Sequence, residues 1–323
     1  MKNEVLYNSF LEKITQKIPH QAEAAHILAN MLFITKEKAH KKLRREDSFT
    51  FDEIITISGQ LGISLDRLKT DNAPAVKPFG SKLVEYLNPA ELDFALLEAL
   101  AIILKPLRDV PNAFGGEITN VLPRPLYMTC ESIFKFDLFR WKYQSNNSHE
   151  IVPYKDIVIM DKLRMQLEKT VKYAKNIHTD YIFDNQIFHY LVTDVKYFYF
   201  AGLLSDEEVR QIKEDLLKIL HKIDCLSQTG FFNETGKKIN IYLSNVKINT
   251  SYIYINAPDY QLAIVKAFLL NGIASIDEKT FKILNSKLQA IKRQSVLITG
   301  SGEKERIKFL KEQRRFIEDL SKL

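Results

Sequence analysis

The pattern that most constrains this chain lies in residues 21–45, where two helical stretches flank a short turn. The segment LANMLFITKEKAHKKLRRE carries apolar side chains three or four positions apart on both sides of the turn at residues 32–34. That spacing is the period of an α-helix with one buried face. Thr35 stands where a hydroxyl side chain would cap the second helix. We therefore predict helices over 21–32 and 35–45, joined by a tight turn.

Further helices are expected on both sides of this pair. Apolar residues at helical spacing predict a first helix over 4–17. The sequence TFDE at 50–53 has the spacing of a capping box, which opens a helix that Gly62 would end. A short fifth helix follows at 64–68. Together these elements predict a five-helix domain over residues 1–72.

The stretch TDNAPAVKPFGS at 70–81 combines two prolines, a glycine and small residues, which is the composition of a linker. We place a linker at 73–81 and a second domain at 82–323. There the prolines and the Gly-Gly pair predict a long loop at 105–126. The remaining apolar spacing predicts a helix or strand at 130–144, and helices at 154–176, 182–202, 206–223, 259–272, 277–295 and 303–321.

Residues 237–257 change period: KKINIYLSNVKINTSYIYINA alternates apolar and polar side chains and is rich in Ile, Val and Tyr. Alternation of this kind predicts a β-hairpin or a three-stranded meander. The expected fold is therefore mainly α. A five-helix domain precedes a larger helical α+β domain with a small β-hairpin or meander near 237–257.

The composition excludes several classes of protein. The net charge is +6 and the pI is near 9.0, which suits an acidic partner without requiring one. Cys130 and Cys225 are the only cysteines, so neither a disulfide framework nor a CxxC metal motif is present. No stretch has the length of uncharged apolar residues that a membrane helix needs, and the N-terminus lacks a leader pattern. We expect a cytoplasmic protein with no membrane partner.

Residues 21–69 resemble the helix-turn-helix domain of the phage-repressor and Cro-like transcription regulators. The segments that carry the resemblance are ILANMLFITKEKAHKKLRRE and TFDEIITISGQLGISLDRL. Three positions depart from the family pattern. Phe33 replaces the glycine of the tight turn, Ala25 replaces a phosphate-binding glutamine, and Lys42 takes a usually apolar place. A side chain at positive φ costs about 1–2 kcal/mol, so Phe33 predicts a remodelled turn.

The resemblance implies that helix 35–45 enters the major groove of double-stranded DNA. Lysines at its start would donate to guanine, and Glu37 would accept from cytosine. Arg44 and Arg45 would bind phosphates, which fixes register rather than sequence. A plain solvated helix face is the alternative interpretation of such a charge run. The implied DNA-binding residues are Thr35, Lys36, Glu37, Lys38, His40, Lys41, Arg44 and Arg45.

The second domain offers no motif for catalysis. His149, His178, His189 and His221 have no metal-ligand spacing, and His178 and Asp180 would not share a helix face two positions apart. GSGEK at 300–304 lacks the spacing of a phosphate-binding loop. We predict no catalytic residue, no metal and no cofactor, and hence no enzyme. The aromatic residues at 181–204 would fill a core, line a small-molecule pocket or form a dimer face.

These observations support two functions. The first is a sequence-specific DNA-binding transcription regulator, expected to be a homodimer, whose residues 82–323 dimerise and respond to a small-molecule or protein effector. The second is a non-catalytic protein-interaction module whose helical N-terminal domain docks a protein partner. An enzyme that carries a DNA-binding domain is a weaker third interpretation.

Overall fold

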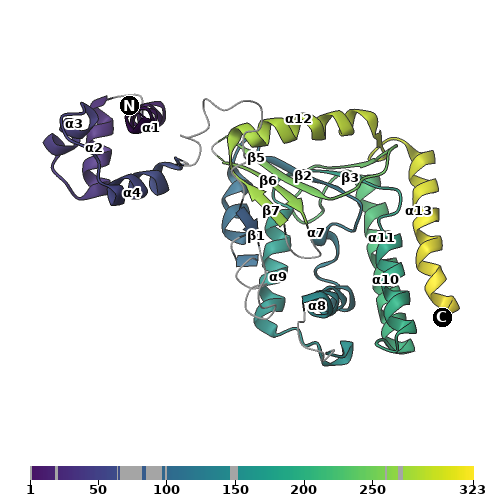
Figure 1. Cartoon of the computed structure of the whole chain (residues 1–323). Helices are drawn as coiled ribbons and strands as arrows, with labels where there is room; N and C mark the ends of the chain where they lie inside the picture. Colours follow the sequence, from purple (N-terminus) through teal and green to yellow (C-terminus); the bar gives the residue numbers. More distant parts are fainter. Residues whose placement is uncertain are drawn as a thin grey trace. The chain divides into compact units, whose positions relative to one another are not determined.

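A computed structural model gives the architecture of the chain, which divides into two compact units, residues 1–80 and 81–323. Figure 1 shows a small all-helical unit and a larger unit built around a sheet. The structure describes residues 2–18, 21–63, 65, 82–84, 97–98, 100–145, 152–258, 260–267 and 272–323. The predicted linker at 73–81 lies outside these residues, as does the predicted fifth helix apart from Leu65.

The helical unit contains α1 (Lys2–Lys17), α2 (Gln21–Leu32), α3 (Lys36–Leu43) and α4 (Phe51–Leu61). Its capping residues adopt the arrangements that their spacing in the sequence predicts. Thr50 and Glu53 form a reciprocal capping box at the start of α4, and Gly62 ends that helix in the left-handed conformation. The core that joins the helices consists of Phe10, Leu11, Ile14, Ala25, Leu28, Ala29, Ala39, Phe49, Ile57 and Ile63.

The larger unit is organised by a mixed sheet, which has eight strands among the described residues, in the order β1-β7-β6-β5-β2-β3-β4-β8. Strands β2, β3 and β4 are parallel, and every other pairing is antiparallel. The strands are β1 (Lys82–Val84), β2 (Phe114–Thr119), β3 (His178–Phe183), β4 (Ile239–Leu243), β5 (Tyr252–Ala257), β6 (Tyr260–Lys266), β7 (Gly272–Ser275) and β8 (Val296–Leu297).

Helices cover both faces of this sheet (Figure 1). Successive strand residues point to opposite faces, so Ile182 packs with residues of α12, whereas Tyr181 and Phe183 join the larger core on the other side. The helices are α7 (Arg124–Tyr127), α8 (Glu131–Ser145), α9 (Asp161–Ala174), α10 (His189–Phe200), α11 (Asp206–Thr229), α12 (Glu278–Gln294) and α13 (Glu303–Glu318), with 3-10 turns at 106–109, 154–156 and 319–322. Residues 97–98 and 100–104 are also helical.

The expectation of a mainly α fold with one small hairpin is therefore wrong, because the larger unit is an α/β structure with an extended mixed sheet. Strand β2 lies in the predicted loop at 105–126. Strand β3 lies where the predicted helices 154–176 and 182–202 nearly meet. Strands β6 and β7 replace most of the predicted helix 259–272.

Each misassigned strand has a physical reason. Gly115 and Gly116 belong to β2, where a Cβ on Gly116 would lie 2.2 Å from the carbonyl oxygen of Asp180. The pair therefore marks a close approach of backbones within the sheet, not a turn. Strand β3 is buried on both faces, so it lacks the alternation of a half-exposed strand.

No helix of the described residues is long and apolar enough to cross a membrane.

Candidate nucleic-acid interface

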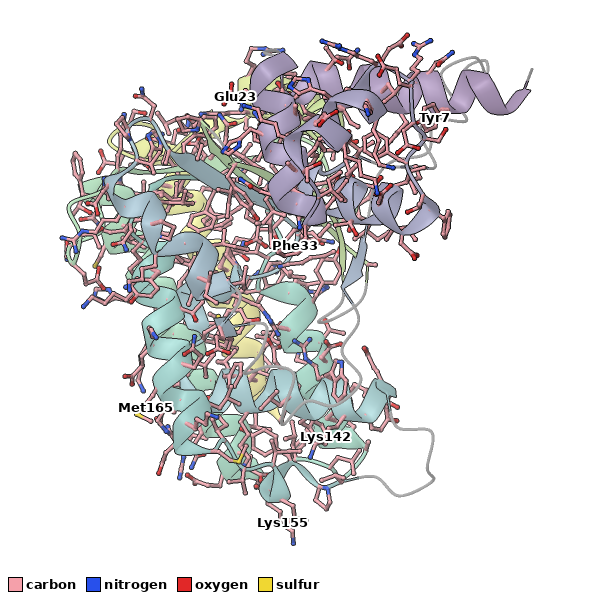
Figure 2. All side chains as sticks on the ribbon, turned by 90° about the vertical axis from the view of Figure 1, so that its left-hand side faces the viewer. Tyr7, Glu23, Phe33, Lys142, Lys155 and Met165 are labelled. Atoms are coloured by element: carbon pink, nitrogen blue, oxygen red, sulfur yellow. The ribbon has the colours of Figure 1, made fainter. Side chains whose placement is uncertain are left out.

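The turn between α2 and α3 keeps a left-handed residue although it contains no glycine. Phe33 has φ +54°, and the amide of Ile34 donates to the carbonyl of Ala29 at 3.1 Å. This hydrogen bond closes the end of α2 in the manner of a helix C-terminal motif. Phe33 is 95% exposed (Figure 2), so its side chain contributes little packing to offset the backbone strain. The turn thus differs from the remodelled geometry that the missing glycine predicted.

Helix α3 is fixed at its start and along its inner face. The side chain of Thr35 caps the helix by accepting from the amide of Lys38 at 3.3 Å. Ala39 is fully buried, and Ile34 and Leu43 pack against the same core. Small side chains at Ala25 and Ala29 let α2 lie close to α3. These contacts hold α3 with its polar face outward.

The predicted DNA-binding residues lie on this outer face and just beyond it. Helix α3 ends at Leu43, so Arg44 is its C-cap residue and Arg45 follows at φ +65°. Both arginines therefore lie in the connection to α4, not in the helix. An ion pair of 3.4 Å joins Lys41 and Glu37, which are one helical turn apart. The exposed members are Thr35, Lys36, Glu37, Lys38, Lys41, Arg44 and Arg45, and His40 is partly buried.

The structure brings these residues together into one surface, here called the α3 face, made of the eight residues from Thr35 to Arg45 named above. Five of them are cations, and Glu37 is the single carboxylate. A surface with that charge favours contact with a polyanion. The lysine and glutamate side chains also offer the donors and the acceptor that base edges require.

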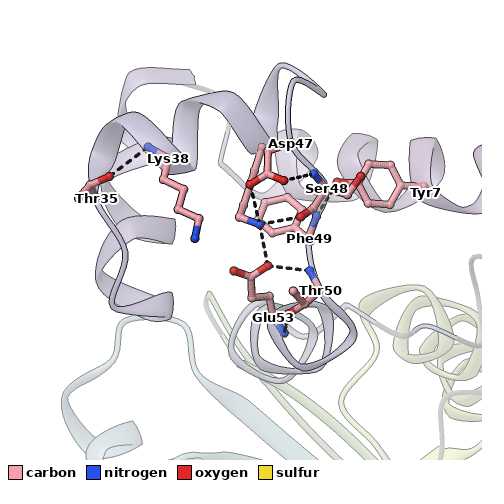
Figure 3. A network of polar contacts seen from close by, with 9 residues as sticks. Tyr7, Thr35, Lys38, Asp47, Ser48, Phe49, Thr50 and Glu53 are labelled. Atoms are coloured by element: carbon pink, nitrogen blue, oxygen red, sulfur yellow. Dashed lines mark hydrogen bonds and ion pairs between the residues drawn. The ribbon is translucent and has the colours of Figure 1, made fainter.

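Lys42 has a structural role that its position in the sequence did not predict. Its side chain is only 2% exposed, and its ammonium donates to the carbonyl of Ser48 at 2.6 Å and to Glu53 at 3.0 Å. Asp47 lies 3.2 Å away. Figure 3 shows this network, in which Glu53 also accepts from the amide of Thr50 as part of the capping box. Lys42 thereby ties the end of α3 to the start of α4.

Electrostatics supports that role. Burial alone would lower the pKa of Lys42, but the hydrogen bonds and charges of Glu53 and Asp47 raise it overall. Burial would raise the pKa of Glu53, yet the amide of Thr50 and the ammonium of Lys42 lower it overall. Both groups are thus held in their charged forms. The only sequence indication was a lysine at a usually apolar position beside a capping box.

His178 and Asp180 do share a face, contrary to our expectation, because they lie on strand β3, where residues two apart point the same way. His178 Nε2 is 3.2 Å from Asp180 Oδ1, and Asn240 donates to the same oxygen at 2.8 Å. Lys292 of α12 pairs with Asp180 at 2.5 Å. Burial would raise the pKa of Asp180, but these partners lower it to about 2. The cluster joins β3, β4 and α12.

The other sequence candidates remain dispersed. His189 packs against Phe316, and His221 lies beside Cys225 on α11. His149 lies outside the described residues. Among those residues, no group of three or more His, Cys, Asp or Glu side chains has the arrangement of a metal site.

Comparisons with models of protein families, with curated proteins and with solved structures found nothing that matches this chain.

Proposed function

We propose that the chain is a sequence-specific DNA-binding transcription regulator that inserts α3 into the major groove. The observation that carries this proposal is the α3 face, a cationic surface on a helix that a left-handed turn and a buried core hold against α2. A groove-reading helix needs that combination of a rigid inner face and an exposed polar outer face. Helices α2 and α3 supply both.

The contacts divide into two kinds. Lys36, Lys38 and Glu37 lie in the first turn of α3, where side chains of a recognition helix reach base edges. Arg44 and Arg45 lie past its end and would bind phosphates. A homodimer would present two such helices to half-sites about one helical turn, roughly 10 base pairs, apart. The larger unit would dimerise the chain and hold any effector.

A charge-matched pair of variants of the full chain tests the proposal. Lys38→Ala with Lys41→Ala removes two cations from the α3 face, whereas Lys13→Ala with Lys17→Ala removes two cations from α1. We expect the α3 double variant to bind duplex DNA at least tenfold more weakly. The slope of log affinity against log salt concentration should become shallower by about two, because about two fewer counterions are released. The α1 double variant should bind like the parent. Equal losses in both proteins would show nonspecific charge attraction and contradict the assignment.

A docking surface for a protein partner is the second candidate, and one observation favours it. Phe33 and Phe51 are 95% and 72% exposed, and large exposed apolar side chains occur at protein interfaces. Phe33→Ser separates the two functions. A DNA reader should keep its duplex affinity in this variant, whereas a docking module would lose its partner and would bind no DNA at any salt concentration.

A further inference from the structure

The last helix of the larger unit, α13, has one buried face and one cationic face. Phe309, Gln313 and Ile317 are buried, and the helix lies against α10 and α11 at the edge of the unit (Figure 1). Residues three or four positions apart share one side of a helix, and the side opposite the buried one carries four cations. All four are exposed, and we call them the α13 stripe: Lys304, Lys308, Lys311 and Arg315.

The carboxylates of α13 do not neutralise this stripe. Glu303 pairs with Arg306 at 3.9 Å, and Glu318 pairs with a lysine of α11 at 3.0 Å. Glu305 and Glu312 lie beside the stripe, but among the described residues no ion pair joins either of them to its cations. The positive charge of the α13 stripe therefore faces solvent without a partner carboxylate.

Neighbouring helices arrange their exposed cations differently. Lys218 of α11 pairs with Asp215 at 2.8 Å, and Lys282 of α12 pairs with Glu278 at 2.6 Å, so each cation has a carboxylate one helical turn away. The α13 stripe instead sets like charges three or four positions apart, and each such pair costs about 0.2–0.5 kcal/mol of helix stability. An anionic partner would remove this repulsion, which is the first indication that the stripe is a binding surface.

The shape of the stripe favours the phosphates of a nucleic acid over a membrane surface. From Lys304 to Arg315 the helix rises by about 16 Å, at about 1.5 Å per residue. Duplex DNA carries one negative charge for about every 1.7 Å of its axis, and cations that contact its phosphates release condensed counterions. A helix that binds a membrane surface inserts its apolar face, whereas the apolar face of α13 is in the core and Ile307 is its single exposed large apolar side chain.

We propose that the α13 stripe binds the phosphate backbone of double-stranded DNA without reading its sequence. Lysine and arginine form strong charge-assisted hydrogen bonds with phosphate oxygens, and such contacts add affinity but carry no sequence information. Two surfaces of one chain that contact the same duplex strengthen each other's binding. This inference rests on the proposed function, because it extends DNA contact from α3 to the larger unit.

Fluorescence anisotropy of a labelled duplex of scrambled sequence, titrated with the full chain at several salt concentrations, tests the stripe. The stripe variant carries Lys304→Gln, Lys308→Gln and Lys311→Gln. A matched control removes three exposed lysines elsewhere in the larger unit, by Lys169→Gln, Lys172→Gln and Lys247→Gln. Circular dichroism checks that both variants are folded, as expected for substitutions of exposed side chains.

The stripe variant should bind the scrambled duplex at least tenfold more weakly than the parent chain. Its slope of log affinity against log salt concentration should be shallower by about 2.7, because about 0.9 counterion is released for each phosphate contact. The ratio of its affinities for a selected and a scrambled duplex should equal that of the parent. The control variant should bind like the parent, and equal losses in the two variants would overturn the proposal.

The same titration separates this inference from the proposed function. If the α3 double variant binds more weakly and the stripe variant binds like the parent, the assignment of α13 is overturned and that of α3 stands. If the stripe variant binds more weakly and the α3 double variant binds like the parent, the DNA contact of α13 stands and the role of α3 is contradicted.

Polyglutamate as a competitor tests whether the stripe distinguishes phosphates from carboxylates. At equal charge concentration, polyglutamate should displace the labelled duplex at least tenfold less effectively than unlabelled duplex does, because the denser charge of DNA condenses more counterions. Equal displacement by polyglutamate would indicate a docking site for acidic peptides and would overturn the proposal.

Discussion

The two units place their charged groups in opposite ways. In the helical unit the cations lie on the outside of α3, around a small core of aliphatic side chains and a few phenylalanines. In the α/β unit several charges lie inside as pairs, among them Glu117 with Lys266 and Asp180 with Lys292. An outward charged face suits an extended polyanion, whereas the enclosed pairs join β2 to β6 and β3 to α12 within one fold. Lys42 is the exception, an enclosed cation in the helical unit.

The largest difference in stability is expected between alanine substitutions of two glycines, Gly116 in β2 and Gly59 in α4. In Gly116→Ala the new Cβ would lie 2.2 Å from the carbonyl oxygen of Asp180 and 2.6 Å from the hydroxyl of Tyr254. Backbone in a packed sheet cannot move far, so we expect a loss of at least about 3 kcal/mol. Gly59, inside α4, has nothing within 4 Å of its Cβ position. Gly59→Ala should instead stabilise the helical unit by about 0.5–1 kcal/mol.

Separate probes follow the two units in this test. Trp141 is the only tryptophan and is buried in the α/β unit, so its fluorescence in urea reports on Gly116→Ala. Amide hydrogen exchange of α4 reports on Gly59→Ala. A Gly116→Ala protein with the parent's urea midpoint would mean that β2 and β3 do not approach as closely as described.

Neighbouring lysines should separate stability from DNA binding. Lys42→Ala removes the buried partner of Glu53, and breaking such a pair costs about 3 kcal/mol. Lys41 is 54% exposed, so Lys41→Ala should change stability by less than about 0.5 kcal/mol but weaken duplex binding. Hydrogen exchange of α3 and α4 measures the first effect, and DNA titration measures the second. Equal effects of the two variants on exchange would refute the buried role of Lys42.

Acid should affect the α/β unit through Asp180. Its pKa is lowered from 3.8 to about 2 in the folded chain, so its carboxylate stabilises the fold at any pH above about 4. That contribution, about 2 kcal/mol, is lost as the pH falls from 4 to 2. Asp180→Asn should remove this part of the acid dependence, followed by Trp141 fluorescence in urea. If the free energy of unfolding of Asp180→Asn falls between pH 4 and 2 as steeply as that of the parent, another group causes the acid dependence.

The smallest expected effect concerns the turn. Phe33→Gly relieves the left-handed strain and should stabilise the helical unit by about 1 kcal/mol. DNA affinity should stay within a factor of two, because Phe33 is outside the α3 face. Slower exchange of α2 and α3 amides would register the gain. Faster exchange would indicate that the exposed ring makes a contact that the structure does not show.

The sequence predicts the helical unit well where its information is local. A cap at Thr35, a capping box at Thr50 and Glu53, and a left-handed Gly62 each depend on residues within one helical turn, so their spacing alone identifies them. The Lys42 network could not be predicted, because it joins residues 11 positions apart across two helices. The only sequence feature that indicated it was Lys42, a lysine at a usually apolar position.

The α/β unit was harder to predict because its strands pair over long distances. β2 pairs with β3 and β5, which are more than 50 and 130 residues further along the chain. Gly115 and Gly116 resemble a turn until Asp180 and Tyr254 are known to lie against them. His178 and Asp180 become a pair only when 178–183 is a strand.

Selection of duplexes from a random library by the full chain, at a low and a moderate salt concentration, tests most directly whether α3 reads DNA sequence. We predict enrichment of one sequence with two related half-sites about 10 base pairs apart, retained at moderate salt and lost in the Lys38→Ala and Lys41→Ala double variant. A folded parent chain that enriches no sequence at either salt concentration would contradict the assignment of α3 as a DNA-reading helix.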